Sequence, residues 1–232
     1  MTEWSWEVFY DAFPFVAKGI GITAGLTFAS FAFALVFGFF WTILRRIPIR
    51  PIQFISTWTM EFIRSTPPLV QLYFIFFAFP EIPVIGEYLT FSPFMSGVIG
   101  LGVHFSTYIS EVYRSGIEDV DKGQWEAAKA LNFPAWKKWT KIILPQAIPP
   151  TIPMIGNYLI ILFKEVPLAS TIGVIGIMQL ADNYGSKYFN YVEPYTAVAI
   201  LFLVLSYPSA LLIRFFEKKM NRKFDKNAMN NN

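Results

Sequence analysis

The sequence predicts an all-α integral membrane protein with five transmembrane helices and one long amphipathic loop in water. Three observations support this fold class. Hydrophobic residues make up 54% of the 232 residues and charged residues only 15%, whereas soluble domains are about a quarter charged. Five apolar runs approach or exceed the roughly 20 helical residues that cross a hydrocarbon core. A segment rich in lysine and tryptophan interrupts these runs.

The apolar runs follow one another with clear breaks between them. The predicted spans are, in order, residues 20–44, 52–79, 91–113, 148–168 and 195–216. The second run contains the pair Pro67-Pro68, which is expected to unwind or kink its helix. Residues 170–180 are only moderately apolar and predict a short interfacial or partial helix. A polar connector with Asp182 and Asn183 is expected to follow it.

Lysine and arginine are distributed unevenly between the predicted loops. They are concentrated after the first, third and fifth spans. Because basic loops stay on the cytoplasmic side of a membrane, the N-terminus is expected outside and the C-terminus in the cytoplasm. The chain then divides into an extracytoplasmic segment (1–19), a transmembrane domain (20–216) and a basic cytoplasmic tail (217–232). The tail is rich in asparagine and is expected to be disordered from residue 218.

Several kinds of chemistry have no candidate residues in this sequence. The chain has no cysteine and only one histidine, His104, so no metal site is predicted and His104 is expected to pack inside a helix. It contains no GxxxxGK[ST] loop to cradle a nucleotide and no GxSxG or HExxH motif. We therefore expect the chain to bind no cofactor, and another chain to supply energy for any energised work.

Residues 126–145 form a charged segment with aromatic residues at helical spacing. Glu126 and four lysines require water, while an apolar stripe requires a partner. The stripe comprises Trp125, Ala128, Leu131, Trp136 and Trp139. Such a stripe with lysines around it suits a protein groove with an acidic rim. The same composition also suits a helix lying on anionic lipid.

The spacing within this segment is characteristic. Glu126-Ala127-Ala128 is followed after three residues by Asn132, and after nine more by the sequence IILP at 142–145. This resembles the EAA loop of the membrane subunits of binding-protein-dependent ABC importers, whose pattern is EAA, three residues, Gly, nine residues and I-x-L-P. The resemblance to the polar amino acid branch of that family extends to Tyr108, Glu111, Arg114, Gly116-Ile117, Val120, Gly123-Gln124, the stretch FIRSTPPLVQ at 62–71, and Asn157 followed by Lys164.

In that family the loop forms two short helices that dock in a cleft of a cytoplasmic ATPase. The resemblance therefore implies a set of ATPase-coupling residues: Gly123, Gln124, Glu126, Ala127, Ala128, Asn132, Ile142, Leu144 and Pro145. Asn132 replaces the family's glycine. Because asparagine tolerates the left-handed conformation, we expect Asn132 to end the first helix with a positive φ, and Pro134 to open the second.

Polar residues inside the predicted spans are candidates for a substrate path. Glu61 and Arg64 are three residues apart and can pair on one helical face. Ionisable residues within a span indicate a pathway or an internal ion pair, and a broken helix often builds a midplane substrate site. The full candidate set is Glu61, Arg64, Thr66, Gln71, Asn157 and Lys164. In the alternative, Glu61 and Arg64 lie at the cytoplasmic end and only stabilise packing.

The resemblance implies a permease subunit of an ATP-driven importer for polar amino acids or a related compatible solute such as ectoine. It is expected in the cytoplasmic membrane of a prokaryote. The expected partners are an ABC ATPase, a second permease subunit (identical or homologous), an extracytoplasmic solute-binding protein and the lipid bilayer, and no nucleic acid. On this view the chain is not itself an enzyme. Two alternatives remain: a stand-alone ion-coupled solute carrier and a membrane-embedded enzyme. The pair Val166-Pro167 departs from the Ser/Thr-rich family pattern, so the solute is not determined.

Overall fold

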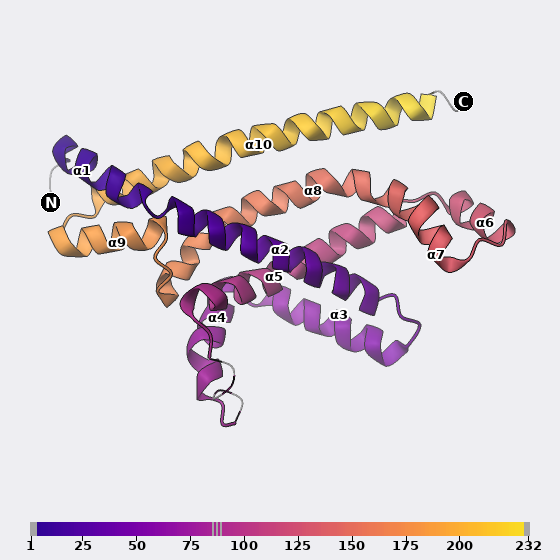
Figure 1. Cartoon of the computed structure of the whole chain (residues 1–232), viewed down its shortest axis with the longest axis horizontal. Helices are drawn as coiled ribbons and strands as arrows, with labels where there is room; N and C mark the ends of the chain where they lie inside the picture. Colours follow the sequence, from indigo (N-terminus) through magenta and orange to yellow (C-terminus); the bar gives the residue numbers. More distant parts are fainter. Residues whose placement is uncertain (1–3, 85, 87, 89, 230–232) are drawn as a thin grey trace.

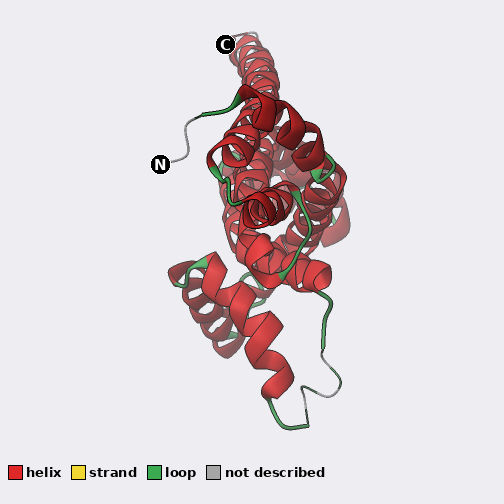
Figure 2. Ribbon diagram, turned by 90° about the vertical axis from the view of Figure 1, so that its left-hand side faces the viewer, coloured by secondary structure: helices red, strands yellow, loops and turns green. Residues whose placement is uncertain are grey.

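The computed structural model describes residues 4–84, 86, 88 and 90–229. Within these residues the chain is built from helices and loops, with no strand (Figure 2). The ends of the predicted N-terminal segment (1–3) and tail (230–232), and residues 85, 87 and 89 of the connector after the second span, lie outside the described residues.

The elements follow one another in a simple order. They are α1 (Trp6–Ala17), α2 (Ile20–Leu44), α3 (Arg50–Ser65), α4 (Pro68–Tyr73), the π-helical turn η1 (Phe74–Ala78), the 3₁₀ turn η2 (Phe79–Glu81), α5 (Pro93–Glu118), α6 (Lys122–Ala130), α7 (Ala135–Lys137), the π-helical turn η3 (Lys138–Ile143), α8 (Leu144–Glu165), the 3₁₀ helix η4 (Val166–Ile172), α9 (Ile177–Tyr188) and α10 (Val192–Met229).

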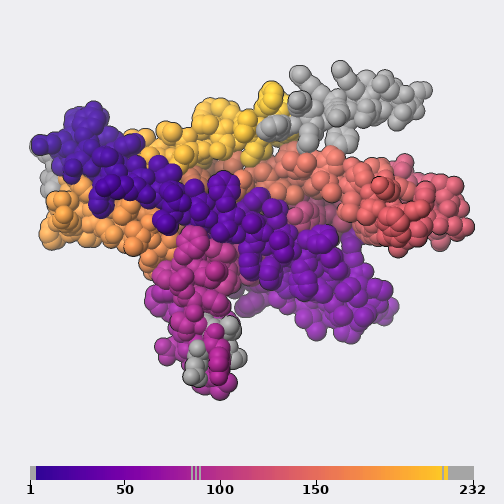
Figure 3. All heavy atoms as spheres, viewed as in Figure 1, coloured from indigo at the N-terminus to yellow at the C-terminus, as the bar shows by residue number. Residues whose placement is uncertain are grey.

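The long helices lie roughly along one axis. The chain runs in one direction in α2, α5 and α10 and returns in α3 and α8 (Figure 1). As a result α1 and α9 lie at one end of the bundle, and α6, α7 and the C-terminal end of α10 lie at the other. The segment that begins with α4 projects sideways from this body (Figure 3). The first and last described helices thus lie with α1 at one end of the bundle and the end of α10 at the other, and the sidedness of the termini stays a prediction (Figure 1).

Three helical stretches of the described residues are long and apolar enough to cross a membrane: Ile20–Leu44, Ala135–Ile172 and Val192–Phe215. A fourth span results if α3 and Pro68–Glu81 are counted together. The third predicted span corresponds to α5, which is not in this set. Glycine, serine and threonine occupy much of α5, and most of these residues are buried against other helices rather than turned to lipid. The count of five spans therefore stays a prediction.

Helix α5 is the centre of the fold. Leu101, Phe105 and Ile109 of α5 form the main core cluster with residues of α2, α4 and α8. Small residues bring these helices close together. A Cβ atom added to Gly38 of α2 would lie 2.8 Å from Ile109 Cγ2, and one added to Gly116 of α5 would lie 2.3 Å from a methyl carbon of Thr151 on α8.

At the opposite end from α6, contacts distant in the sequence join α1 to the last part of the chain. The backbone N–H of Ser5 donates to Oε1 of buried Glu193 at 2.7 Å. The hydroxyl of Tyr184 on α9 donates to Asp11 of α1 at 2.9 Å. The N-terminal segment is thus a helix held by α9 and α10, which its sequence alone did not predict.

The prediction for residues 170–190 was partly wrong. The partial helix predicted at 170–180 is divided between η4 and α9, and α9 continues through the predicted connector to Tyr188. Its polar residues have partners within the fold, since Asp182 accepts a hydrogen bond from Tyr195 and Tyr184 donates to Asp11. Tertiary contacts of this kind override weak helix propensity.

The predicted disorder of the tail was wrong up to residue 229. Helix α10 continues without a break to Met229. Most residues of this stretch are charged or unbranched, and lysine, glutamate, arginine and methionine are good helix formers. A polar composition therefore does not exclude a helical extension of the preceding span, and the cytoplasmic location of the tail stays a prediction.

Candidate functional site

The predicted coupling loop forms one end of the molecule, remote from α1 (Figure 3). Helix α6 starts at Lys122 after Asp121, whose carboxylate accepts a hydrogen bond from the N–H of Gly123 at 2.7 Å. Aspartate is a preferred residue at this position because it satisfies a free helical N–H. Gly123, Gln124, Glu126 and Ala127 are all exposed on this helix. The loop therefore presents its family motif to the surroundings of the bundle.

Asn132 ends α6 as the sequence predicted. Its φ is +51°, in the left-handed region. The N–H of Asn132 donates to the carbonyl of Lys129 at 3.0 Å, and the N–H of Phe133 donates to that of Ala128 at 3.1 Å. These two bonds are those of a Schellman motif. Helix α7 then begins at Ala135, with Pro134 as its N-cap residue.

Substitutions at Asn132 should separate its backbone role from any role of its side chain. We expect Asn132→Ala to lower the free energy of unfolding by about 1 kcal/mol, because a Cβ disfavours the left-handed conformation. Asn132→Gly should be neutral or slightly stabilising. Thermal denaturation of the purified chain in detergent measures both. A melting temperature for the glycine variant below that of the alanine variant would contradict the backbone role.

The apolar stripe is divided between two surfaces, so the prediction of one continuous face was wrong. Trp125 and Trp139 contact edge to face, with ring centroids 5.3 Å apart, and pack with Ile143 in a cluster that also contains Ile117 and Val120. The chain itself is the partner of this part of the stripe.

The other part of the stripe has no such partner among the described residues. Leu131 and Trp136 are 69% and 60% exposed, and Phe133, which sequence reasoning missed, is exposed beside them. Exposed basic residues surround these side chains: Lys122, Lys129, Lys137 and Lys141. We call Glu126, Leu131, Phe133 and Trp136 together the docking surface.

The last three predicted coupling residues serve mainly to hold this surface in place. Ile142 is half-buried against the tryptophan cluster. Leu144 is half-buried, and Pro145 lies in the first turn of α8, where a missing N–H costs nothing. Ala128 is the buried residue of α6 itself. The structure thus brings the predicted set together, with Gln124 and Glu126 outside and Ala128 and Ile142 inside.

The break at Pro67-Pro68 is also as predicted. Helix α3 ends at Ser65, α4 starts at Pro68, and the two segments are bent by 104°. Proline at position 67 removes the N–H that would bond the carbonyl of Ile63. The side-chain amide of Gln71 replaces it, since its Nε2 lies 2.7 Å from that carbonyl oxygen and 3.1 Å from that of Thr66.

Two of the candidate path residues therefore have a structural function. Gln71 Nε2 also lies 2.7 Å from Oγ1 of Thr66 and 3.2 Å from Nδ1 of His104. Thr66 Oγ1 itself donates toward the carbonyls of α3. The side chains of Thr66 and Gln71 thus hydrogen-bond backbone carbonyls at the break between α3 and α4. His104 is a buried, hydrogen-bonded helix residue as expected.

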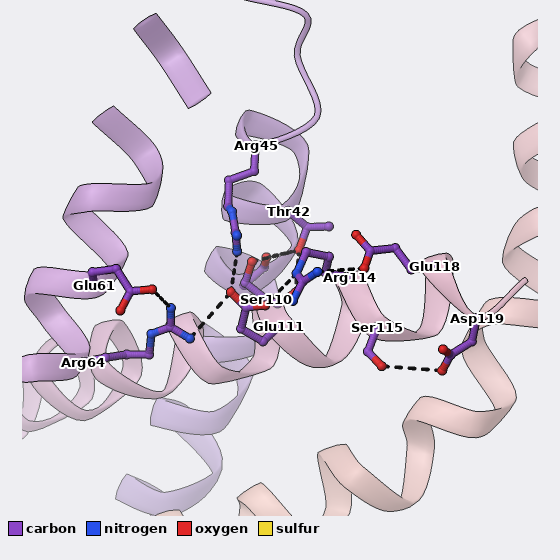
Figure 4. Close-up of polar contacts among 11 residues, drawn as sticks. Thr42, Arg45, Glu61, Arg64, Ser110, Glu111, Arg114, Ser115, Glu118 and Asp119 are labelled. Atoms are coloured by element: carbon purple, nitrogen blue, oxygen red, sulfur yellow. Dashed lines mark hydrogen bonds and ion pairs between the residues drawn. The ribbon is translucent and has the colours of Figure 1, made fainter. Parts of the chain in front are cut away.

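Glu61 and Arg64 form the predicted ion pair, and they extend it into a larger ion cluster (Figure 4). Glu111 of α5 accepts from Arg45 at the end of α2 and from Arg114 Nε at 2.7 Å, while Arg64 lies 3.5 Å from it. Arg114 also bonds Glu118 at 2.7 Å. The cluster therefore connects α2, α3 and α5, and Glu111 lies at its centre.

Asn157 and Lys164 are not part of this cluster. They are seven residues apart on α8 and share one exposed helical face with Met154 and Ile161. Neither side chain makes a hydrogen bond or ion pair within the described part of the chain. The neighbouring Glu165 has a buried Oε2 atom with no partner there. The candidate path residues thus fall into three separate groups: Glu61 and Arg64 at the ion cluster, Thr66 and Gln71 at the break between α3 and α4, and Asn157 and Lys164 along α8.

Sequence reasoning missed Arg45 and Glu111 as members of this site. A signal was present, because Glu111 and Arg114 are three residues apart within the matched motif. The contact with Arg45 had no local signal, since the two residues are 66 positions apart in sequence.

Comparisons with known proteins give a consistent result. A family model described as "Binding-protein-dependent transport system inner membrane component" matches residues 34–222. A probable amino-acid ABC transporter permease protein of Sinorhizobium fredii is 37% identical over 210 residues, covering 90% of this chain and 89% of that protein. The arginine transport system permease protein ArtQ of Bacillus subtilis is 32% identical over 214 residues, covering 92% and 94% respectively.

Solved structures resemble the fold closely. A crystal structure of an amino acid ABC transporter with histidines superposes with a TM-score of 0.85 at 30% identity, covering 94% of this chain and 100% of that one. An inward-facing structure of the MetNI methionine ABC transporter has a TM-score of 0.72 at 20% identity, covering 89% and 96%. The second likeness concerns the fold alone.

Proposed function

The chain belongs to the family of binding-protein-dependent transport system inner membrane components, and from this membership we propose that it is the permease subunit of an ATP-driven importer of amino acids. Proteins of this family are transport subunits rather than enzymes, and the ATPase activity lies in a separate subunit. Membership in this family therefore argues against both alternative functions, the stand-alone carrier and the membrane-embedded enzyme.

The observation that carries this proposal is the docking surface at the α6–α7 end. Leu131, Phe133 and Trp136 are exposed apolar residues of this surface. Trp125 and Trp139 pack against the helix bundle and hold the surface in place. Exposed aromatic residues anchored on a rigid base are typical of the centre of a protein interface. We infer that the apolar residues of the docking surface enter a cleft of the ATPase, and that Glu126 and the surrounding lysines lie at the rim of this interface. The chain itself binds no nucleotide in this proposal.

The remaining partners follow from the polar residues of the spans. Asn157 and Lys164 are exposed on α8 in the single chain, and an ionisable group facing lipid is costly. A second permease subunit, identical or homologous, would cover this face and enclose a path between the two chains. An extracytoplasmic solute-binding protein would deliver the solute at the α1–α9 end.

The orientation in the membrane follows from charge. Arg45 and Arg46 directly follow α2, whose C-terminal end is directed toward the α6–α7 end, and the exposed lysines near the docking surface belong to α6, α7 and η3. Basic loops favour the cytoplasmic side, so the C-terminus is proposed to be cytoplasmic and the N-terminus outside. This is the side on which a cytoplasmic ATPase would meet α6 and α7.

The proposed solute is a polar amino acid. The named relatives support this class, and the path residues offer suitable groups. Arg64 keeps a buried Nε atom without a partner in the described part of the chain, and Glu61 is half-exposed next to it. A zwitterion presents one carboxylate and one ammonium group, which these two residues complement. A compatible solute such as ectoine, which also carries both charges, is the second candidate.

Reconstitution tests the proposal. The chain would be purified with an ABC ATPase and a solute-binding protein from the same organism and placed in proteoliposomes. We expect uptake of a radiolabelled amino acid that requires ATP, the ATPase and the binding protein. Ectoine is assayed in parallel and decides between the two solute classes. Uptake that persists without the ATPase would overturn the assignment.

A further inference from the structure

A polar cavity lies between the C-terminal end of α2 and the second half of α5. Its volume is about 450 Å³, and it is lined by Thr42, Arg45, Arg46, Ser110, Arg114 and Glu118. Three positive charges thus face one negative charge. Figure 4 shows the lining residues other than Arg46. A cavity with this excess of guanidinium groups is suited to an anion.

Most of the lining is held rigidly before any ligand arrives. Glu111 binds both Arg45 and Arg114 from behind the cavity, and Glu118 holds the other side of Arg114. Thr42 Oγ1 and Ser110 Oγ form a buried hydrogen-bonded pair 3.1 Å apart. Preorganised arginine groups lose little freedom on binding, which favours recognition of a planar or tetrahedral oxyanion.

Arg46 differs from the other two arginines. It makes no ion pair within the described residues, and its guanidinium carbon lies 5.8 Å from the ring centroid of Trp139. Its pKa lies below the ordinary arginine value because burial removes water from the guanidinium, an effect that Glu118 opposes and nearby Arg114 adds to. Arg46 is therefore an exposed guanidinium group that no carboxylate bonds directly within the described residues.

An exposed apolar face leads directly to this cavity. Val36, Phe39 and Ile43 are exposed on α2 and follow the three- and four-residue spacing of one helical face. From Val36 to Leu44, where α2 ends, the helix rises about 12 Å, and Arg46 lies in the turn that follows. Because α2 is one of the apolar spans, this face lies within the hydrocarbon region. An anion bound at Arg46 thus has room beside it for an apolar tail.

We propose that this cavity binds the phosphate of an anionic phospholipid headgroup, with an acyl chain lying along Val36, Phe39 and Ile43. Arginine pairs with phosphate oxygens through two parallel N–H bonds, and basic pockets between membrane helices attract anionic headgroups. The bound lipid lies against Trp139, and through it against the base of the docking surface. This inference does not depend on the transported solute or on the ATPase.

The test uses the full chain purified in detergent and titrated with short-chain phosphatidylglycerol, followed by calorimetry and native mass spectrometry. We expect one lipid per chain. Phosphatidylcholine of the same chain length should bind at least tenfold more weakly. Arg46→Gln should weaken phosphatidylglycerol binding roughly fivefold, the effect of one basic residue at a membrane surface. The matched control is Arg50→Gln, which removes an exposed arginine a few residues away and should change the affinity less than twofold.

Competition with inorganic phosphate tests whether the cavity binds a lipid headgroup or a free phosphate ion. It should compete with phosphatidylglycerol only at millimolar concentration, because it lacks the acyl chain. Phosphate binding as tight as that of the lipid would overturn the lipid assignment in favour of a soluble anion. Equal affinity for phosphatidylglycerol and phosphatidylcholine, or equal effects of the Arg46 and Arg50 substitutions, would overturn the site itself.

Discussion

Replacing Glu126 with lysine is expected to lower ATP-driven uptake at least tenfold while the protein still reaches the membrane. Glu126 is exposed on α6 and has no hydrogen-bond or ion-pair partner within the described residues, so its reversal should leave the fold intact. In the proposed complex the carboxylate meets the ATPase at the rim of the docking surface. We expect this carboxylate to meet a positive group of the ATPase, so that reversing its charge places like charges opposite each other across the interface and disfavours association. Uptake per permease in proteoliposomes measures the effect.

The matched control for this variant is Glu7→Lys. It makes the same substitution at an exposed position of α1, at the opposite end of the molecule. We expect the Glu7 variant to retain ATPase binding, measured by co-purification of the ATPase with the permease, and the Glu126 variant to lose it. Normal co-purification and normal uptake with Glu126→Lys would show that the docking surface is not where the ATPase binds.

Glu111→Gln is expected to have the largest effect on stability. Arg45 and Arg114 both bond this carboxylate and Arg64 lies close to it. Neutralising it leaves Arg45 without an ion-pair partner among the described residues, while Arg64 and Arg114 keep Glu61 and Glu118. Removing one partner of a buried ion pair costs about 3–5 kcal/mol. Glu111 is 23% exposed, so solvent reduces this cost to roughly 2–3 kcal/mol. Thermal denaturation in detergent should show a loss of several degrees.

Asp119→Asn is the control for that measurement. Asp119 follows α5, and its carboxylate accepts a hydrogen bond from Ser115 at 3.5 Å, exposed to solvent. It makes no ion pair within the part of the chain that the structure describes. The same loss of one carboxylate charge should change the melting temperature by less than one degree. If the Glu111→Gln and Asp119→Asn variants have the same melting temperature, the ion cluster does not stabilise the contact of α2, α3 and α5.

Features with a local cause were predictable from the sequence. The first span was predicted as residues 20–44 and forms α2 with the same bounds, because arginines and a proline follow the apolar run at once. The break at Pro67 needs only the missing N–H, and the positive φ of Asn132 needs only the end of a helix. In each case a few neighbouring residues determine the conformation.

Features that depend on distant residues were not predictable. Gln71 was expected in the substrate path because nothing local showed that it would bond the carbonyl of Ile63. Glu111 obtains its central position from arginines on two other helices. Helix α9 is stabilised by contacts with α1 and α10 rather than by its own composition. These groups meet only in the folded chain, and their spacing in the sequence does not predict that they are in contact.

The contact between Ser5 and Glu193 has a consequence for biosynthesis. The two residues are 188 positions apart, so α1 emerges from the ribosome long before Glu193 and Tyr184 have been translated. Domains fold while the chain is still being made, from the N-terminus onward, yet α1 must wait for almost the entire polypeptide. The beginning of this protein is therefore among the last parts to be locked in place, and a nascent chain that stops before α10 leaves α1 without its anchor.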